Sequence, residues 1–175
     1  MARLAVWFFA FSCAIYAMTT VWVAIALPEG PIPTHWSSLG DAPADGWSSP
    51  SGAVWFLVLL GAFLAALFGG LLFWFSRSTT MTGLNVPNLD FWTRPENIAE
   101  VRRRSTIDVS LMAGTMMLVM AAIGPSILIA AHDPEHRSPV WFDILMGVWV
   151  VGILAHAFWM ARSRYRIPPE NERNW

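Results

Sequence analysis

The sequence predicts an all-α integral membrane protein with four transmembrane helices, and its composition and the arrangement of its apolar residues lead to that fold class. Hydrophobic residues make up 55% of the 175 residues and charged residues 13%, about half the charged share of a soluble domain. The apolar residues form four blocks, at about 4–27, 52–76, 106–131 and 139–161, and a membrane-spanning helix needs about 20 residues. The segments between them are too short and polar to bury a core, so we expect residues 1–175 to form a single membrane domain.

The distribution of arginine predicts how the helices are oriented. All 11 basic residues are arginine, and Arg137 alone falls in the loops 28–51 and 132–138, whereas the others fall in the loop 77–105 and near the two termini. Basic residues concentrate on the cytoplasmic side of a membrane. We therefore expect both termini and the inner loop 77–105 to be cytoplasmic, and the other two loops to face outward.

The first block is interpreted as a retained helix rather than a cleaved signal peptide. Arg3 precedes it, and Ala24 and Ala26 have the spacing of a cleavage site. Its apolar run is nevertheless much longer than the ~7–15 residues of a signal peptide. Cys13 lies within this block and is the single cysteine of the chain, so no intramolecular disulfide can form. We expect Cys13 to be a packing residue.

The second block carries small residues along one helical stripe. Ala62, Ala66 and Gly70 recur at four-residue spacing, and small residues let a neighbouring helix backbone approach closely. We predict that this stripe is the packing face of the second helix. Packing within the chain is preferred to packing against a partner.

The inner loop predicts an interfacial helix that leads into the third span. Its segment 93–96, Thr-Arg-Pro-Glu, fits a capping box. In this motif the first side chain accepts from the backbone amide of the fourth residue, and the glutamate side chain accepts from the backbone amide of the first. We therefore expect a helix that starts near Arg94. Arg102, Arg103 and Arg104 then lie at the level of anionic lipid headgroups, which are expected partners together with the lipid bilayer.

The third block combines a methionine stripe with a helix breaker. Met112, Met116 and Met120 recur at four-residue spacing, and adaptable packing is a more common role for methionine than ligation of a soft metal. Pro125 lacks an amide hydrogen and clashes with the carbonyl group of Ala121, so we expect the helix to kink there.

Three ionisable residues lie within predicted spans, where such groups are functional candidates by default. Asp143 lies near the outer end of the fourth span, and we expect it to cap the helix or face water. Asp108 lies near the cytoplasmic end of the third span, and His156 lies in the last third of the fourth. Antiparallel packing of these helices puts the two at similar depth, where they could relay protons. A structural hydrogen bond is the preferred interpretation.

The remaining chemistry points away from an enzyme. The outer loops contain His35, Asp41, Asp45, His132 and His136, but their spacing matches no tight metal site. The chain has no signature of a hydrolase, a nucleotide-binding protein or a redox protein. A net charge of −1 and arginines next to the membrane argue against nucleic-acid binding. We therefore expect no catalytic residue, no metal and no cofactor.

Two motifs resemble a known family. The first is residues 32–36, Ile-Pro-Thr-His-Trp, followed by Gly40 and by residues 45–47, Asp-Gly-Trp. The second is residues 85–92, Asn-Val-Pro-Asn-Leu-Asp-Phe-Trp, followed by residues 94–96, Arg-Pro-Glu. In this order and topology they resemble the family called domain of unknown function 1648 (DUF1648), which is related to SdpI-like immunity proteins. The residues that carry the resemblance are Pro33, His35, Trp36, Gly40, Asp45 and Gly46 in the outer loop, and Asn85, Pro87, Asn88, Asp90, Trp92, Pro95 and Glu96 in the inner loop.

The resemblance implies a multi-pass protein of the bacterial plasma membrane. SdpI-like proteins are linked to resistance against a secreted peptide toxin and to signalling. We therefore expect a non-catalytic protein that binds a peptide or protein partner, of the SdpI-related sensor or immunity type. An accessory subunit of a larger membrane complex is one alternative, and a small proton-coupled transporter using Asp108 and His156 is another.

Overall fold

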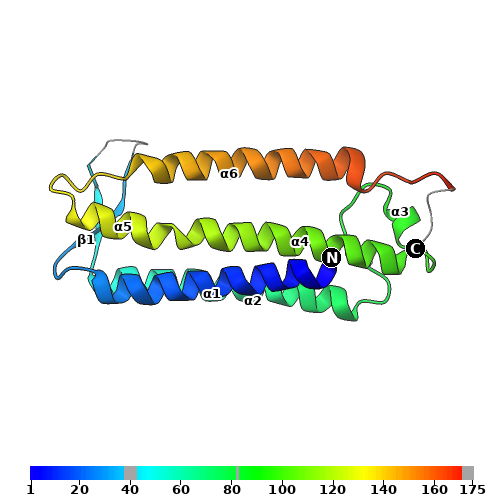
Figure 1. Ribbon diagram of the computed structural model, residues 1–175, viewed down its shortest axis with the longest axis horizontal. Coiled ribbons are helices and arrows are strands. Elements are labelled where there is room, and N and C mark those ends of the chain that lie inside the picture. The colour runs from blue at the N-terminus through cyan, green and yellow to red at the C-terminus, as the bar shows by residue number, and fades with distance from the viewer. Residues whose placement is uncertain (38–42, 82, 171–175) are drawn as a thin grey trace.

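Four long helices dominate the computed structural model, which describes residues 1–37, 43–81 and 83–170 (Figure 1). Their bounds are α1 Ala2–Ala26, α2 Pro50–Arg77, α4 Ile98–Ala121 with its continuation α5 Ile123–His132, and α6 Val140–Trp159, which ends in the π-helical turn η1 Met160–Arg164. Each of the four is long and apolar enough to cross a membrane. The prediction of a mostly helical, multi-pass membrane protein is therefore confirmed.

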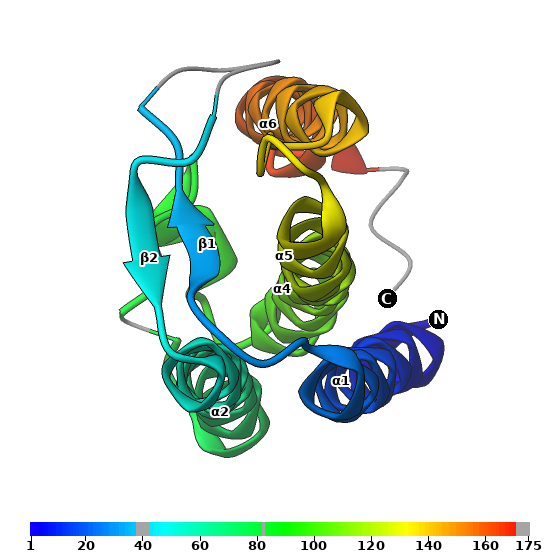
Figure 2. The same cartoon turned by 90° about the vertical axis from the view of Figure 1, so that its left-hand side faces the viewer.

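Helices α1, α2 and α4 form the packed part of the bundle, and α6 lies apart from α1 and α2 with α4 and α5 between them (Figure 2). The core of this part combines Phe9 and Tyr16 of α1 with Leu64 of α2 and Met117 of α4. Helix α6 has no buried residue. The fourth helix is therefore less embedded than the other three, and one hydrogen bond near its middle runs from the Trp149 indole to the Thr115 hydroxyl over 3.5 Å.

The contact between α1 and α2 depends on Gly61. The Tyr16 hydroxyl donates to the carbonyl oxygen of Leu57 over 2.6 Å, and a Cβ atom at Gly61 would lie 2.2 Å from the Tyr16 ring. The predicted stripe of Ala62, Ala66 and Gly70 is exposed instead, so its assignment as a packing face within the chain was wrong. Each residue turns a helix by about 100°, so the step from position 61 to 62 moves the stripe off the buried face.

The structure bears on two predictions about the third helix. Met116 and Met120 pack against the α1–α2–α4 core, while Met112 lines cavities between α4 and α6. The helix is also divided, because α4 ends at Ala121 and α5 begins at Ile123. Pro125 explains the break, since it offers no amide hydrogen to the carbonyl group four residues earlier.

A two-stranded antiparallel sheet joins α1 to α2, which the sequence did not predict. Strands β1 (Ile32–His35) and β2 (Gly46–Ser48) pair with an irregularity between Pro33 and His35. A Cβ atom at Gly46 would lie 2.6 Å from that of His35, so glycine permits the strands to approach. Ile32 is fully buried against Ala53 of α2 and Ile127 of α5, and this contact fixes the hairpin to the bundle.

The segment before α4 differs from its prediction. A short helix α3 (Leu89–Trp92) comes first, and α4 begins at Ile98, later than the expected start near Arg94. The Thr93 hydroxyl donates backward to the carbonyl oxygen of Leu89 over 2.9 Å, so the predicted capping box does not form. The Asn97 side chain donates to the carbonyl oxygen of Phe91, which directs residues 93–97 into turns instead of a helix.

Candidate functional site

Polar and aromatic side chains gather at the two ends of the bundle. We call the end with β1 and β2 the hairpin end, and the end with α3 and η1 the Arg-rich end (Figure 1). Both motifs found in the sequence lie in these regions, the first at the hairpin end and the second at the Arg-rich end. The helices between the two ends therefore act mainly as the scaffold that separates them.

A cavity of about 620 Å³ opens at the hairpin end between the hairpin and helices α2, α5 and α6. We call it the hairpin cavity. The strands run between the end of α2 and the end of α6 (Figure 2). Residues of the hairpin that line it are Thr34, His35, Trp36, Trp47 and Ser48. The first motif therefore builds one wall of a cavity whose volume is in the range of ligand sites, about 300–1,000 Å³.

His35 and Asp45 close the mouth of the hairpin. The ring Nδ1 of His35 lies 2.6 Å from Oδ1 of Asp45, and the backbone amide of Asp45 donates to the carbonyl oxygen of His35 over 3.0 Å. Both side chains are largely exposed, and an exposed pair contributes little to stability. The pair therefore sets the position of the imidazole at the cavity wall rather than the stability of the fold.

Trp36 and Trp47 tie the hairpin to the loop before α6. The Trp36 indole donates to the carbonyl oxygen of His136 over 2.9 Å, and the Trp47 ring meets the His136 ring edge-on at 5.0 Å between centroids. The His136 ring is itself held, because Nδ1 donates to the carbonyl oxygen of Ala130. Two loops far apart in the sequence therefore form one wall.

The remaining residues that line the hairpin cavity offer apolar surface with a few polar groups. Phe56 and Phe142 supply aromatic rings, and Ser126, Ser138 and Asp143 supply polar atoms. Among residues 1–37, 43–81 and 83–170, no three His, Cys, Asp or Glu side chains are close enough to hold a metal ion. The arrangement suits a ligand that has both an apolar part and a hydrogen-bonding part. Gly40 and Asp41 lie outside the described residues.

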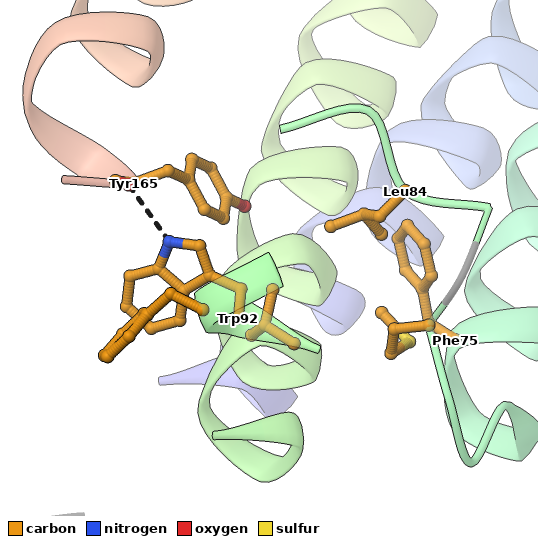
Figure 3. Close-up of a cluster of buried hydrophobic side chains, with 7 residues drawn as sticks. Phe75, Leu84, Trp92 and Tyr165 are labelled. Atoms are coloured by element: carbon orange, nitrogen blue, oxygen red, sulfur yellow. Dashed lines mark hydrogen bonds between the residues drawn. The ribbon is translucent and has the colours of Figure 1, made fainter. Parts of the chain in front are cut away.

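At the Arg-rich end, the backbone of Tyr165 is held by the second motif. Its carbonyl oxygen accepts hydrogen bonds from the Asn88 side chain at 2.9 Å and from the Trp92 indole at 3.0 Å, the latter drawn in Figure 3. Trp92 is fully buried and meets the Tyr165 ring edge-on. Asn88 has φ 59°, a left-handed conformation that asparagine tolerates better than most residues. Two side chains of the motif therefore hold the same carbonyl oxygen.

The Tyr165 side chain connects η1 to α4, toward which its hydroxyl points (Figure 3). The hydroxyl donates to Oδ2 of Asp108 over 2.9 Å and lies 3.3 Å from the Ser105 hydroxyl. Arg164 also donates to Oδ2 of Asp108, over 3.3 Å. Burial raises the pKa of Tyr165, which lies just beyond the fourth candidate span, above its ordinary value. The hydroxyl therefore stays protonated and continues to donate.

The three consecutive arginines have partners within the chain. Arg103 and Arg104 both donate to Glu100, and the Arg104 guanidinium lies 4.6 Å from the centre of the Trp92 ring. Arg102 donates to the carbonyl oxygen of Ser78 just after α2. About half of the Arg103 side chain is exposed, so Arg103 remains the most accessible of the three to a lipid headgroup.

Asp108 and His156 are not joined by a hydrogen bond. The partners of Asp108 are Arg164 and Tyr165, which sequence reasoning missed although both follow the fourth span at the depth of Asp108. The His156 ring lies 5.5 Å from the Trp159 ring, centre to centre, at a tilt of 39°, and it lines a different cavity from that of Asp108. Its Nε2 atom is buried without a hydrogen-bond partner in the described part of the chain.

The remaining residues of the second motif are at or near the surface. Asn85 and Pro87 line a cavity next to Asp108, whereas Asp90, Pro95 and Glu96 are exposed. The sequence therefore located the residues that organise both ends of the bundle, but not their contacts. Comparisons with protein-family models, with curated proteins and with solved structures find no match to this chain.

Proposed function

We propose that this chain is a non-catalytic protein of the bacterial plasma membrane that binds a peptide or protein partner at its hairpin end. The resemblance of its two motifs to DUF1648 and SdpI-like proteins suggests this function. The hairpin cavity is the observation that carries the proposal, because His35 and Trp36 of the first motif form part of its wall. If the motif served only to form a turn, its side chains would not need to line a cavity. Their place in the cavity wall therefore favours a binding role.

The charges around the cavity favour a basic partner. One arginine, Arg137, stands among the described acidic residues of this end, and it is bonded to Glu135. Those acidic residues are Glu29, Asp45, Asp133, Glu135 and Asp143. Complementary charge steers association and disfavours wrong partners. A segment with a basic residue beside an aromatic or aliphatic one would match both the charge and the apolar wall.

The orientation follows from the arginine bias and places the hairpin end outside the cell. Both termini and the Arg-rich end are then cytoplasmic, and the first turns of α4 lie at the interface. Arg102, Arg103 and Arg104 would face anionic lipid headgroups there, with Arg103 as the most exposed.

Cysteine labelling tests this orientation. In a Cys13→Ser background, Ser37→Cys and Ser163→Cys each place one thiol at an exposed position at opposite ends of the bundle. We expect a membrane-impermeant maleimide to label intact cells at position 37 and to label position 163 only after permeabilisation. The reverse pattern would place the hairpin cavity in the cytoplasm and remove an extracellular partner.

Photo-crosslinking in native membranes tests partner binding. Trp47 is 48% exposed and lines the hairpin cavity, whereas Trp55 is 63% exposed and lies on α2 outside it. We would replace each in turn with p-benzoylphenylalanine and identify adducts by mass spectrometry. A discrete adduct is expected from position 47 and not from position 55.

A second change connects the adduct to the motif. His35→Ala in the Trp47→p-benzoylphenylalanine chain should abolish the adduct while the amount of protein in the membrane stays unchanged. Equal adducts at both positions, or an adduct that survives His35→Ala, would contradict binding at this cavity. A loss of membrane abundance would show that the hairpin serves the fold.

An accessory subunit of a membrane complex remains a second candidate, because the small-residue stripe of α2 is exposed. Ala62, Ala66 and Gly70 present a smooth helix face that nothing in the described chain covers. A partner that stays bound in mild detergent and is lost in Ala66→Leu, but not in Leu67→Ala on the neighbouring exposed face, would support this function. No comparable observation favours the transporter alternative. Asp108 is bonded to Arg164 and Tyr165 and not to His156, its expected partner in a proton relay.

A further inference from the structure

We propose that a second cavity, beside Asp108 at the Arg-rich end, binds a neutral single-chain amphiphile through a hydroxyl or amide hydrogen-bond donor. This cavity has a volume of about 360 Å³, and we call it the Asp108 cavity. It lies at the opposite end of the bundle from the hairpin cavity. The inference therefore stands independently of the proposed partner.

The walls of the Asp108 cavity are mostly apolar. They come from the end of α2, the loop before α3, the middle of α4 and the end of α6 with η1. Apolar lining residues include Leu71, Trp74, Leu84, Val86, Met112 and Met160. Such a surface favours a hydrocarbon chain over a polar metabolite, because burial of apolar area is the main source of affinity.

Four polar side chains interrupt the apolar lining, and Asp108 is the one that carries a charge; the other three are Asn85, Ser105 and Tyr165. Asp108 is 4% exposed and lines the cavity. Tyr165 and Arg164 both donate to its Oδ2 atom, so neither bond uses the acceptor capacity of Oδ1. A carboxylate oxygen at a cavity wall gains from an additional donor, because a hydrogen bond to a charged group is stronger than one between neutral groups. A ligand that donates one hydrogen bond to Oδ1 would add to the two bonds that Tyr165 and Arg164 give to Oδ2.

The charge of the site selects a neutral donor. Arg164 lies 3.3 Å from Asp108 and balances its charge. A cationic ligand would bring an additional charge into an apolar site, and an anionic ligand would meet the carboxylate directly; both carry the cost of an uncompensated buried charge. A hydroxyl or amide group donates without that cost. The expected ligand therefore joins one such group to an apolar chain.

The position of the cavity allows entry from the bilayer. Ala157 and Ala161 line it from α6 and are both exposed. Exposed groups on an apolar helix that is long enough to span the membrane face lipid. An amphiphile could therefore enter sideways, past small side chains, without opening the bundle.

A pair of probes that differ by one donor tests the proposal. The full chain in phosphatidylcholine nanodiscs would be labelled with a fatty alcohol that carries a diazirine in its chain, and the adducts mapped by mass spectrometry. Oleyl alcohol and its methyl ether would compete, since only the alcohol donates a hydrogen bond. We expect adducts on residues 71–75, 83–87 and 157–161, and competition by the alcohol at about tenfold lower concentration than by the ether.

A matched pair of variants checks the location. Ala157→Phe fills the cavity from an exposed position, and Ala155→Phe adds the same ring to an exposed position of α6 outside the cavity. Labelling should fall at least fivefold in the first variant and remain in the second. Labelling spread evenly over the helices, equal competition by alcohol and ether, or full labelling of a folded Ala157→Phe chain would each overturn the proposal. If Ala157→Phe does not fold, the competition on the unchanged chain still decides.

Discussion

Tyr165→Phe should destabilise the protein because it removes a single atom, the hydroxyl oxygen. The change keeps the buried ring but removes the hydroxyl that donates to Asp108 over 2.9 Å. A hydrogen bond to a charged group contributes about 1.5–3 kcal/mol, against about 0.5–1.5 kcal/mol for a neutral bond. After the change the longer bond from Arg164 to Asp108, 3.3 Å, remains. We therefore expect a loss of about 2 kcal/mol in the free energy of unfolding.

The other tyrosine of the chain provides a matched control. Tyr16 is about as buried as Tyr165, 4% against 2% exposed, but its hydroxyl donates to a neutral carbonyl oxygen. Tyr16→Phe should therefore cost about 1 kcal/mol. The assay is equilibrium unfolding in mixed micelles with increasing sodium dodecyl sulfate, followed by circular dichroism.

A double-mutant cycle isolates the contact itself. Asp108→Asn combined with Tyr165→Phe should show a coupling energy of about 1 kcal/mol or more, as residues in one hydrogen-bond network do. A coupling energy within about 0.3 kcal/mol of zero would refute the reasoning. So would a larger loss from Tyr16→Phe than from Tyr165→Phe, because the argument depends on the charge of the acceptor.

Two further predictions concern stability and use the same assay. Trp92→Phe keeps an aromatic ring beside Tyr165 but loses the indole donor to its carbonyl oxygen, so we expect a loss of about 1 kcal/mol; an unchanged midpoint would show that the bond does not form in the micelle. Gly61→Ala places a methyl group against the Tyr16 ring and should cost about 1–3 kcal/mol. Gly69→Ala is its control, since a Cβ atom there meets nothing within 4 Å; equal losses would remove the close-approach argument.

The four spans could be predicted because length and hydropathy alone determine them. Pro125 likewise acts through its own missing amide hydrogen, so the break after Ala121 followed from one residue. The small-residue stripe was misassigned for the opposite reason. Residue size shows which faces can approach a neighbour, but the choice of Gly61 over Ala62 depends on Tyr16 in another helix.

The functional ends were predicted as motifs but not as contacts. The hairpin requires pairing of Pro33 with Trp47 across an intervening loop, and no local preference specifies that register. Asp108 was recognised as exceptional because it lies within a span. Its partners Arg164 and Tyr165 were not recognised, because their contact depends on the rotation of α6 at its end.

The π-helical turn Met160–Arg164 limits where residues can be inserted into or deleted from this chain. The amide of Tyr165 bonds to the carbonyl oxygen of Met160, five residues earlier, so the turn contains one residue more than an α-helical turn would. Removing a residue there would rotate Arg164 and Tyr165 by about 100° away from Asp108, and adding one would rotate them the other way. Insertions and deletions among related chains should therefore avoid this turn and accumulate in the connections where no side chain has to meet a partner across the bundle.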